Sequence, residues 1–64
     1  MKDKNGKRIS IGDMVLIPKP SLKDDNWTYK FEGTVHCIRE NGLICVEDQD
    51  ENGWDIEANR VEKI

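Results

Sequence analysis

The four aromatic residues of the chain are its best candidates for binding a ligand. Trp27, Tyr29 and Phe31 are spaced by two residues, so their side chains emerge on one face wherever the chain is extended. Aromatic ring faces are electrostatically negative and attract a desolvated cation, and an acidic neighbour strengthens that attraction. We therefore predict an aromatic rim that binds a protein or peptide partner, formed by Trp27, Tyr29, Phe31 and Trp54 with the acidic residues Asp48 and Asp55.

The same aromatic residues also suit a purely structural role. A small β core needs a few large side chains, and Phe31 and Trp54 could supply them while Trp27 and Tyr29 cap one end of the domain. Within the rim we expect Trp27 to be the exposed member.

Basic residues of the N-terminal half offer a second candidate surface. Residues 1–39 carry eight bases and five acids, net +3, whereas residues 40–64 carry two bases and eight acids, net −6. The sum is an overall charge of −3, which argues against a general nucleic-acid binder. The alternative function is binding of RNA or DNA phosphates by a basic set that consists of Lys7, Arg8, Lys19, Lys23 and Lys30.

Few residues could perform catalysis or hold a metal. His36 and Cys37 are adjacent, so in a strand they point to opposite faces and cannot share a proton. One histidine and two cysteines fall short of the roughly four ligands of a zinc site. The segment 48–53 matches the first half of a calcium loop, but Asn59 stands where the bidentate glutamate is needed, so we expect a polar turn. We predict a protein that is not an enzyme and has no metal or cofactor.

Cys37 and Cys45 flank a hairpin turn at Glu40-Asn41-Gly42. A two-residue Asn-Gly loop would place Cys37 opposite Val46, and a three-residue loop would place it opposite Cys45. In either register we expect both residues to be free, inert thiols.

The kinds of apolar residue favour strands. Seven Ile and four Val stand against three Leu and one Ala, and β-branched side chains pack well on a pleated sheet. No twelve-residue window carries the apolar stripe of a helix. We predict main strands at 14–17, 31–39, 43–48, 54–56 and 61–64, a short strand near 7–10, a polar loop at 18–28 and one helical turn at 57–60.

Short motifs span nearly the whole chain. They are Ile9-x-x-Gly12-Asp13-x-Val15, Gly33-Thr34-Val35, Gly42-x-Ile44-x-Val46-x-Asp48, Trp54-x-Ile56 and Val61. In these motifs the chain resembles SH3-like small β-barrels of the Tudor and KOW-like type. The resemblance implies an all-β, five-stranded barrel with one 3₁₀ turn before the last strand. It also implies either an aromatic pocket, which in Tudor-like relatives holds a methylated cation, or a KOW-like accessory role on RNA, DNA or the ribosome.

The predicted core consists of β-branched residues from every strand. Its members are Ile9, Val15, Ile17, Val35, Ile44, Val46, Ile56 and Val61. We expect one barrel domain at 7–64, preceded by a flexible tail at 1–6. The charged start has no apolar signal segment, and no apolar run is long enough to cross a bilayer, so we expect a cytoplasmic monomer. A third possibility is a structural piece of a larger assembly, which would bind nothing in isolation.

Overall fold

Strands form where β-branched residues occupy every second position. In the computed structural model, which describes residues 1–64, Val15 and Ile17 of β1 and Ile44 and Val46 of β3 point to the core, because successive side chains of a strand face opposite sides. The elements are β1 (Met14–Ile17), β2 (Phe31–Ile38), the 3₁₀ turn η1 (Glu40–Gly42), β3 (Leu43–Glu47), β4 (Gly53–Glu57), the 3₁₀ turn η2 (Ala58–Arg60) and β5 (Glu62–Lys63). The structure has no helix with the length and apolar character needed to cross a membrane.

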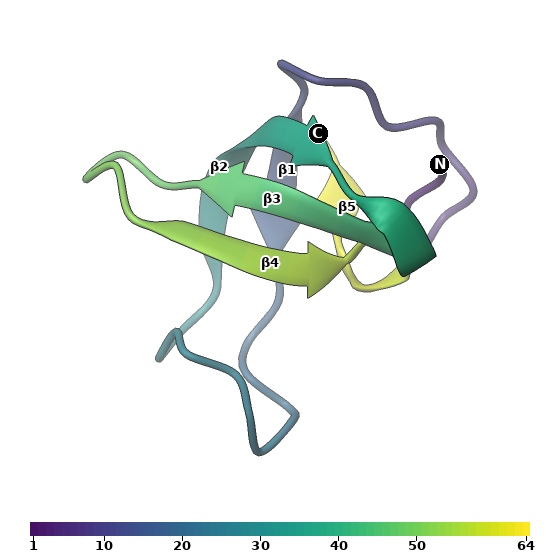
Figure 1. Cartoon of the computed structure of the whole chain (residues 1–64). Helices are drawn as coiled ribbons and strands as arrows, with labels where there is room; N and C mark the ends of the chain where they lie inside the picture. The colour runs from purple at the N-terminus through teal and green to yellow at the C-terminus, as the bar shows by residue number, and fades with distance from the viewer.

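The five strands form one antiparallel sheet in the order β4-β3-β2-β1-β5. Strands β1 to β4 pair with their neighbours in sequence, and β5 returns to pair with β1 through the Val15–Lys63 and Leu16–Glu62 pairs. Figure 1 shows β1 and β5 crossing behind β3 and β4. β4 and β5 remain at the two edges, so the sheet is open. The all-β class, the five strands and the 3₁₀ turn before the last strand are confirmed; a second 3₁₀ turn, η1, was not predicted.

The hydrophobic core lies between the crossing strands. All eight predicted core residues are at most 2% exposed, and they are the largest fully buried side chains of the protein. Trp27 and Ala58 complete the buried apolar cluster, and Phe31 and Trp54 pack against it while half-buried. The prediction of the core is confirmed. Six of its members occupy the inward positions of β1 to β4, and Ile9 and Val61 join the core from outside the strands.

The N-terminal residues lie against the sheet through Asp3, which is 4% exposed. One carboxylate oxygen of Asp3 accepts hydrogen bonds from the backbone N–H groups of Asn5 and Lys7, and the other accepts one from Lys63 in β5. The Lys63 N–H above all lowers the pKa of the Asp3 carboxyl. These contacts hold residues 1–6, the expected tail, beside β5. The strand expected near 7–10 is reduced to a single bridge between Lys2 and Arg8.

A three-residue turn closes the hairpin of β2 and β3. The Arg39 N–H donates to the Leu43 carbonyl at 2.8 Å, and Asn41 takes a left-handed φ of 63° within the turn. This turn places Cys37 directly opposite Cys45. The register then shifts by one residue at a β-bulge between Val35 and Cys37, and Val35 pairs with Val46 on the core side.

Gly33 of β2 is buried between β1 and β3, and we predict that a side chain there destabilises the fold. A Cβ at this position would lie 3.1 Å from Ile17 Cδ1 and 3.2 Å from the Glu47 carbonyl oxygen. Gly33→Ala should lower the free energy of unfolding in urea by about 1–3 kcal/mol. Gly53→Ala is the matched control, because its Cβ would come no closer than 3.7 Å to the Val46 carbonyl. Equal losses in the two variants would contradict this explanation.

Candidate functional site

A cavity of about 230 Å³ opens beside the start of β2. We call it the aromatic pocket, because its lining includes all four aromatic residues of the chain. The loop before β2, the first residue of β2, the turn between β3 and β4 and the start of β4 contribute the lining residues: Asn26, Trp27, Thr28, Tyr29, Phe31, Asp48, Asp50, Asn52 and Trp54. The structure thus brings together five of the six residues predicted for the aromatic rim.

Phe31 and Trp54 form the rigid wall of the pocket. Their ring centroids lie 4.9 Å apart with the planes tilted by 52°, a favourable arrangement for an aromatic pair. Phe31 is fixed by its pairing with Ile17 in β1, and Trp54 by its pairing with Val46 in β3. Both rings pack on the core and keep part of their surface exposed. They therefore serve the core and the pocket at once.

Trp27 is buried, so the expectation that it is the exposed aromatic is wrong. Its side chain is 7% exposed, whereas Tyr29 is 70% exposed. The Trp27 indole N–H donates to the Pro18 carbonyl at 2.7 Å, and the guanidinium of Arg60 lies 5.4 Å from the ring centroid. The chain bends at residues 28 and 29 instead of continuing as a strand, so spacing by two does not fix one common face here.

An ion pair ties the loop that carries Trp27 to η2. Arg60 meets both carboxylate oxygens of Asp25, at 2.8 and 3.2 Å, and the side chains are 17% and 6% exposed. The Asp25 carboxylate also accepts hydrogen bonds from the backbone N–H groups of Ser21 and Leu22. The Arg60 guanidinium therefore holds the pKa of the Asp25 carboxyl well below its ordinary range. One buried carboxylate organises the loop and anchors it to the sheet.

The lining of the pocket is acidic as well as aromatic. Asp48 caps its own turn, because one of its carboxylate oxygens accepts hydrogen bonds from the backbone N–H groups of Asp50 and Asn52 at 2.9 Å. No lysine or arginine forms an ion pair with Asp48 or Asp50. Asp55, the sixth predicted rim residue, does not line the pocket. Its carboxylate pairs with Arg39 at 2.8 Å instead. The pocket thus carries two carboxylates without a basic partner.

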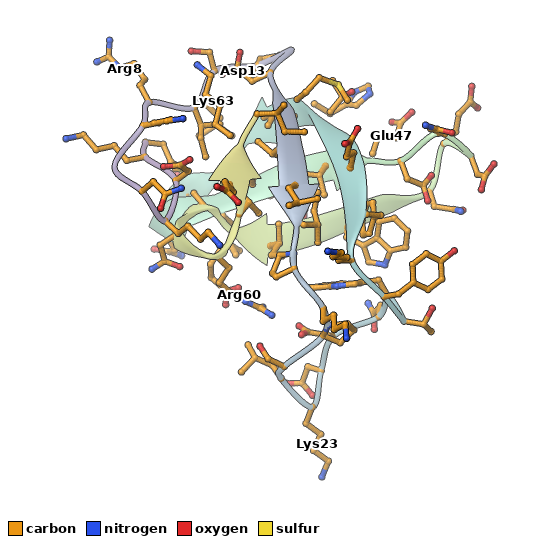
Figure 2. All side chains as sticks on the ribbon, turned by 180° about the vertical axis from the view of Figure 1, so that it is seen from behind. Arg8, Asp13, Lys23, Glu47, Arg60 and Lys63 are labelled. Atoms are coloured by element: carbon orange, nitrogen blue, oxygen red, sulfur yellow. The ribbon has the colours of Figure 1, made fainter.

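The basic residues of the alternative site fall into two separate groups. Lys7 and Arg8 belong to the N-terminal turn, whereas Lys19, Lys23 and Lys30 belong to the loop between β1 and β2. Figure 2 shows Arg8 and Lys23 at opposite ends of the molecule, with Arg60 between the sheet and the loop that carries Lys23. All five side chains are exposed, and they do not converge on one groove.

The histidine and the two cysteines of the chain lie outside the pocket. Cys37 and Cys45 are free thiols, and each is half-buried. The Nε2 atom of His36 lies 2.9 Å from a carboxylate oxygen of Glu47. No group of three or more His, Cys, Asp or Glu side chains is placed to hold a metal ion.

The sequence interpretation missed several residues of the site. Asp50 and Asn52 line the pocket because they alternate with Asp48 in the turn, and the Asp-x-Asp-x-Asn-Gly pattern could have indicated that they lie together. Arg60 and Asp25 are 35 residues apart. No local pattern could have paired them, because the contact exists only after β5 has returned beside β1.

Comparisons with protein-family models, with curated proteins and with solved structures found no match to this chain. The interpretation of the site therefore rests on its geometry and chemistry.

We predict that the Asp25–Arg60 pair makes the free energy of unfolding depend on pH in the acidic range. The pKa of folded Asp25 is lowered from 3.8, so the pair contributes fully above about pH 4 and its contribution is lost as the pH falls further. Asp25→Asn should be less stable than the wild type at neutral pH. The difference in free energy of unfolding between the two proteins should become smaller toward about pH 2. Urea unfolding at stepped pH measures this. Asp24→Asn changes an exposed neighbour and leaves the pair intact, so its free energy of unfolding should vary with pH as that of the wild type does. If the difference between Asp25→Asn and the wild type stayed constant with pH, the pair would not be the source of the pH dependence.

Proposed function

We propose that this protein is a small, non-catalytic binding module that holds a basic side chain of a protein or peptide partner in the aromatic pocket. The observation that carries this proposal is the convergence of Trp27, Tyr29, Phe31 and Trp54 around one cavity. A cavity of about 230 Å³ is smaller than the roughly 300–1,000 Å³ of small-molecule sites. It suits a single side chain better than a whole cofactor.

The charge of the pocket favours a cation as its occupant. Ring faces attract a desolvated ammonium or guanidinium group, and the carboxylates of Asp48 and Asp50 add attraction because no basic residue neutralises them. The same carboxylates repel phosphate, so nucleic acid is disfavoured at this site. A lysine or arginine side chain of the partner meets both requirements, and a methylated lysine gains further from the aromatic walls.

The pocket is also preformed, which lowers the cost of binding. Trp27 is fixed by Pro18 and Arg60, and Phe31 and Trp54 are fixed by strand pairing and by the core. Only Tyr29 keeps most of its side chain in solvent. A rigid site loses little conformational entropy on binding, so even a shallow pocket can hold a peptide weakly and specifically.

We further propose that the fold is an SH3-like small barrel of the Tudor or KOW-like type. The proposal is supported by the strand order β4-β3-β2-β1-β5, by the return of β5 to β1 and by the η2 turn between β4 and β5.

We predict that Tyr29 contributes to peptide affinity without contributing to stability. In a ¹⁵N–¹H NMR titration, a lysine peptide should shift the indole signals of Trp27 and Trp54, and Tyr29→Ala should weaken binding about three- to tenfold. Leu22→Ala removes an exposed apolar side chain of the same loop that does not line the pocket, and it should bind as the wild type does. Shifts confined to other surfaces would contradict the proposal.

The charge of the occupant is tested separately by Asp50→Asn. Asp50 lines the pocket and its carboxylate has no partner within the protein, so its loss should weaken binding of a lysine peptide and leave a norleucine peptide, the uncharged analogue, unchanged. Glu51→Gln removes a neighbouring exposed charge that does not line the pocket and serves as the control. Equal weakening of the lysine peptide by both variants would show that net charge, not the pocket, governs binding.

A further inference from the structure

The hairpin register brings the only two cysteines of the chain face to face. We propose that Cys37 and Cys45 form a cross-strand dithiol that is oxidised to an intramolecular disulfide by thiol–disulfide exchange with a small-molecule disulfide such as glutathione disulfide. The site lies at the end of β2 and the start of β3. The aromatic pocket lies at the other end of β2, so this inference does not depend on the proposed function.

The backbone geometry suits a disulfide. Cys37 and Cys45 are direct partners in the antiparallel ladder, and such partners have Cα atoms about 4.5 or 5.5 Å apart. Both values lie within the roughly 4.4–6.8 Å that disulfides span. Directly opposed residues also point to the same face of the sheet. A bond between the two sulfur atoms therefore requires no change of register.

Both thiols are accessible to a reagent. Cys45 alternates along β3 with Ile44 and Val46, which are fully buried, so its side chain lies on the face away from the core. Both cysteines are half-buried and free. A thiol sealed in the core would be inert, whereas a half-exposed pair on the outer face is open to exchange.

A guanidinium group lies beside the pair. Arg39 Nε meets the Asp55 carboxylate at 2.8 Å, and Asp55 is the direct partner of Cys45 in β4. The Asp55 carboxylate above all raises the pKa of the Arg39 guanidinium, and Cys37 and Cys45 contribute less. Burial and the neighbouring Cys37 raise the pKa of the Cys45 thiol, and Arg39 opposes that rise. Exchange therefore proceeds through a minor thiolate population and is faster at alkaline pH.

The reaction balances in two exchange steps. The thiolate of one cysteine attacks the disulfide reagent, forms a mixed disulfide and releases one thiolate. The second cysteine, as its thiolate, attacks the protein sulfur of that mixed disulfide and releases the second thiolate. The protein loses two electrons and two protons, and the reagent is reduced to two thiols. A reduced thiol pool reverses both steps.

The test is intact-mass analysis of the folded protein in glutathione redox buffers, after acid quenching. The wild type should lose two hydrogen atoms, carry no glutathione and remain a monomer on non-reducing electrophoresis. Cys37→Ser and Cys45→Ser should each accumulate one glutathione adduct, because no second thiol resolves it. Stable adducts on both cysteines of the wild type, disulfide-linked dimers, or reduced protein in buffers that oxidise ordinary dithiols would each overturn the proposal.

A second measurement distinguishes a preorganised pair from two thiols that are merely close in sequence. The equilibrium constant for the internal disulfide should be about 30-fold or more larger in native buffer than in denaturing urea, because a native-like disulfide stabilises the fold by the same factor. Equal constants in both conditions, or a smaller one in native buffer, would mean that the folded geometry does not favour the bond, and would overturn the proposal.

Discussion

The bidentate ion pair between Asp25 and Arg60 is the contact on which the candidate site depends. The 18–30 loop has no strand of its own, so without an anchor its backbone would be free to move away from the sheet. The Asp25 carboxylate accepts hydrogen bonds from the backbone N–H groups of Ser21 and Leu22 and so orders this part of the loop. The ion pair with Arg60, a residue of η2, attaches the ordered part of the loop to that turn. A buried ion pair adds little net stability over an apolar contact, but it specifies one geometry. Here the specified geometry is that of Trp27, which Arg60 covers.

The small core explains why single side chains serve two purposes. Ten buried apolar residues leave little reserve of stability in a domain of this size, so the large aromatic residues must contribute to packing. Phe31 and Trp54 do so from the starts of their strands, where each ring packs against the core and also lines the pocket. The core and aromatic-rim interpretations of the sequence are therefore compatible for these two residues. Tyr29 contributes to the pocket alone, because its side chain is largely in solvent.

Alternation of side chains along strands was enough to predict the five strands and the six core residues within them, because an inward face must be apolar wherever one side of a sheet is solvated. Ile9 and Val61 lie outside the strands and were predicted from their β-branched side chains. The hairpin register could not be predicted, since Asn41-Gly42 suits a two-residue turn and only the structure shows that Glu40 joins it. The burial of Trp27 could not be predicted either. It depends on Arg60, which reaches the ring through tertiary packing. The separation of the predicted basic residues also depends on tertiary structure, because Arg8 and Lys23 lie at opposite ends of the folded molecule (Figure 2).

The most direct test of the binding site is a set of intermolecular nuclear Overhauser effects between a bound lysine peptide and the isotope-labelled protein. If the aromatic pocket holds the partner's basic side chain, the side-chain methylene protons next to the lysine ammonium will show contacts with the rings of Phe31, Trp54 and Tyr29. Contacts from the peptide backbone to the open edge of β4, with none from the lysine side chain to these rings, would contradict the account and indicate binding by strand addition instead.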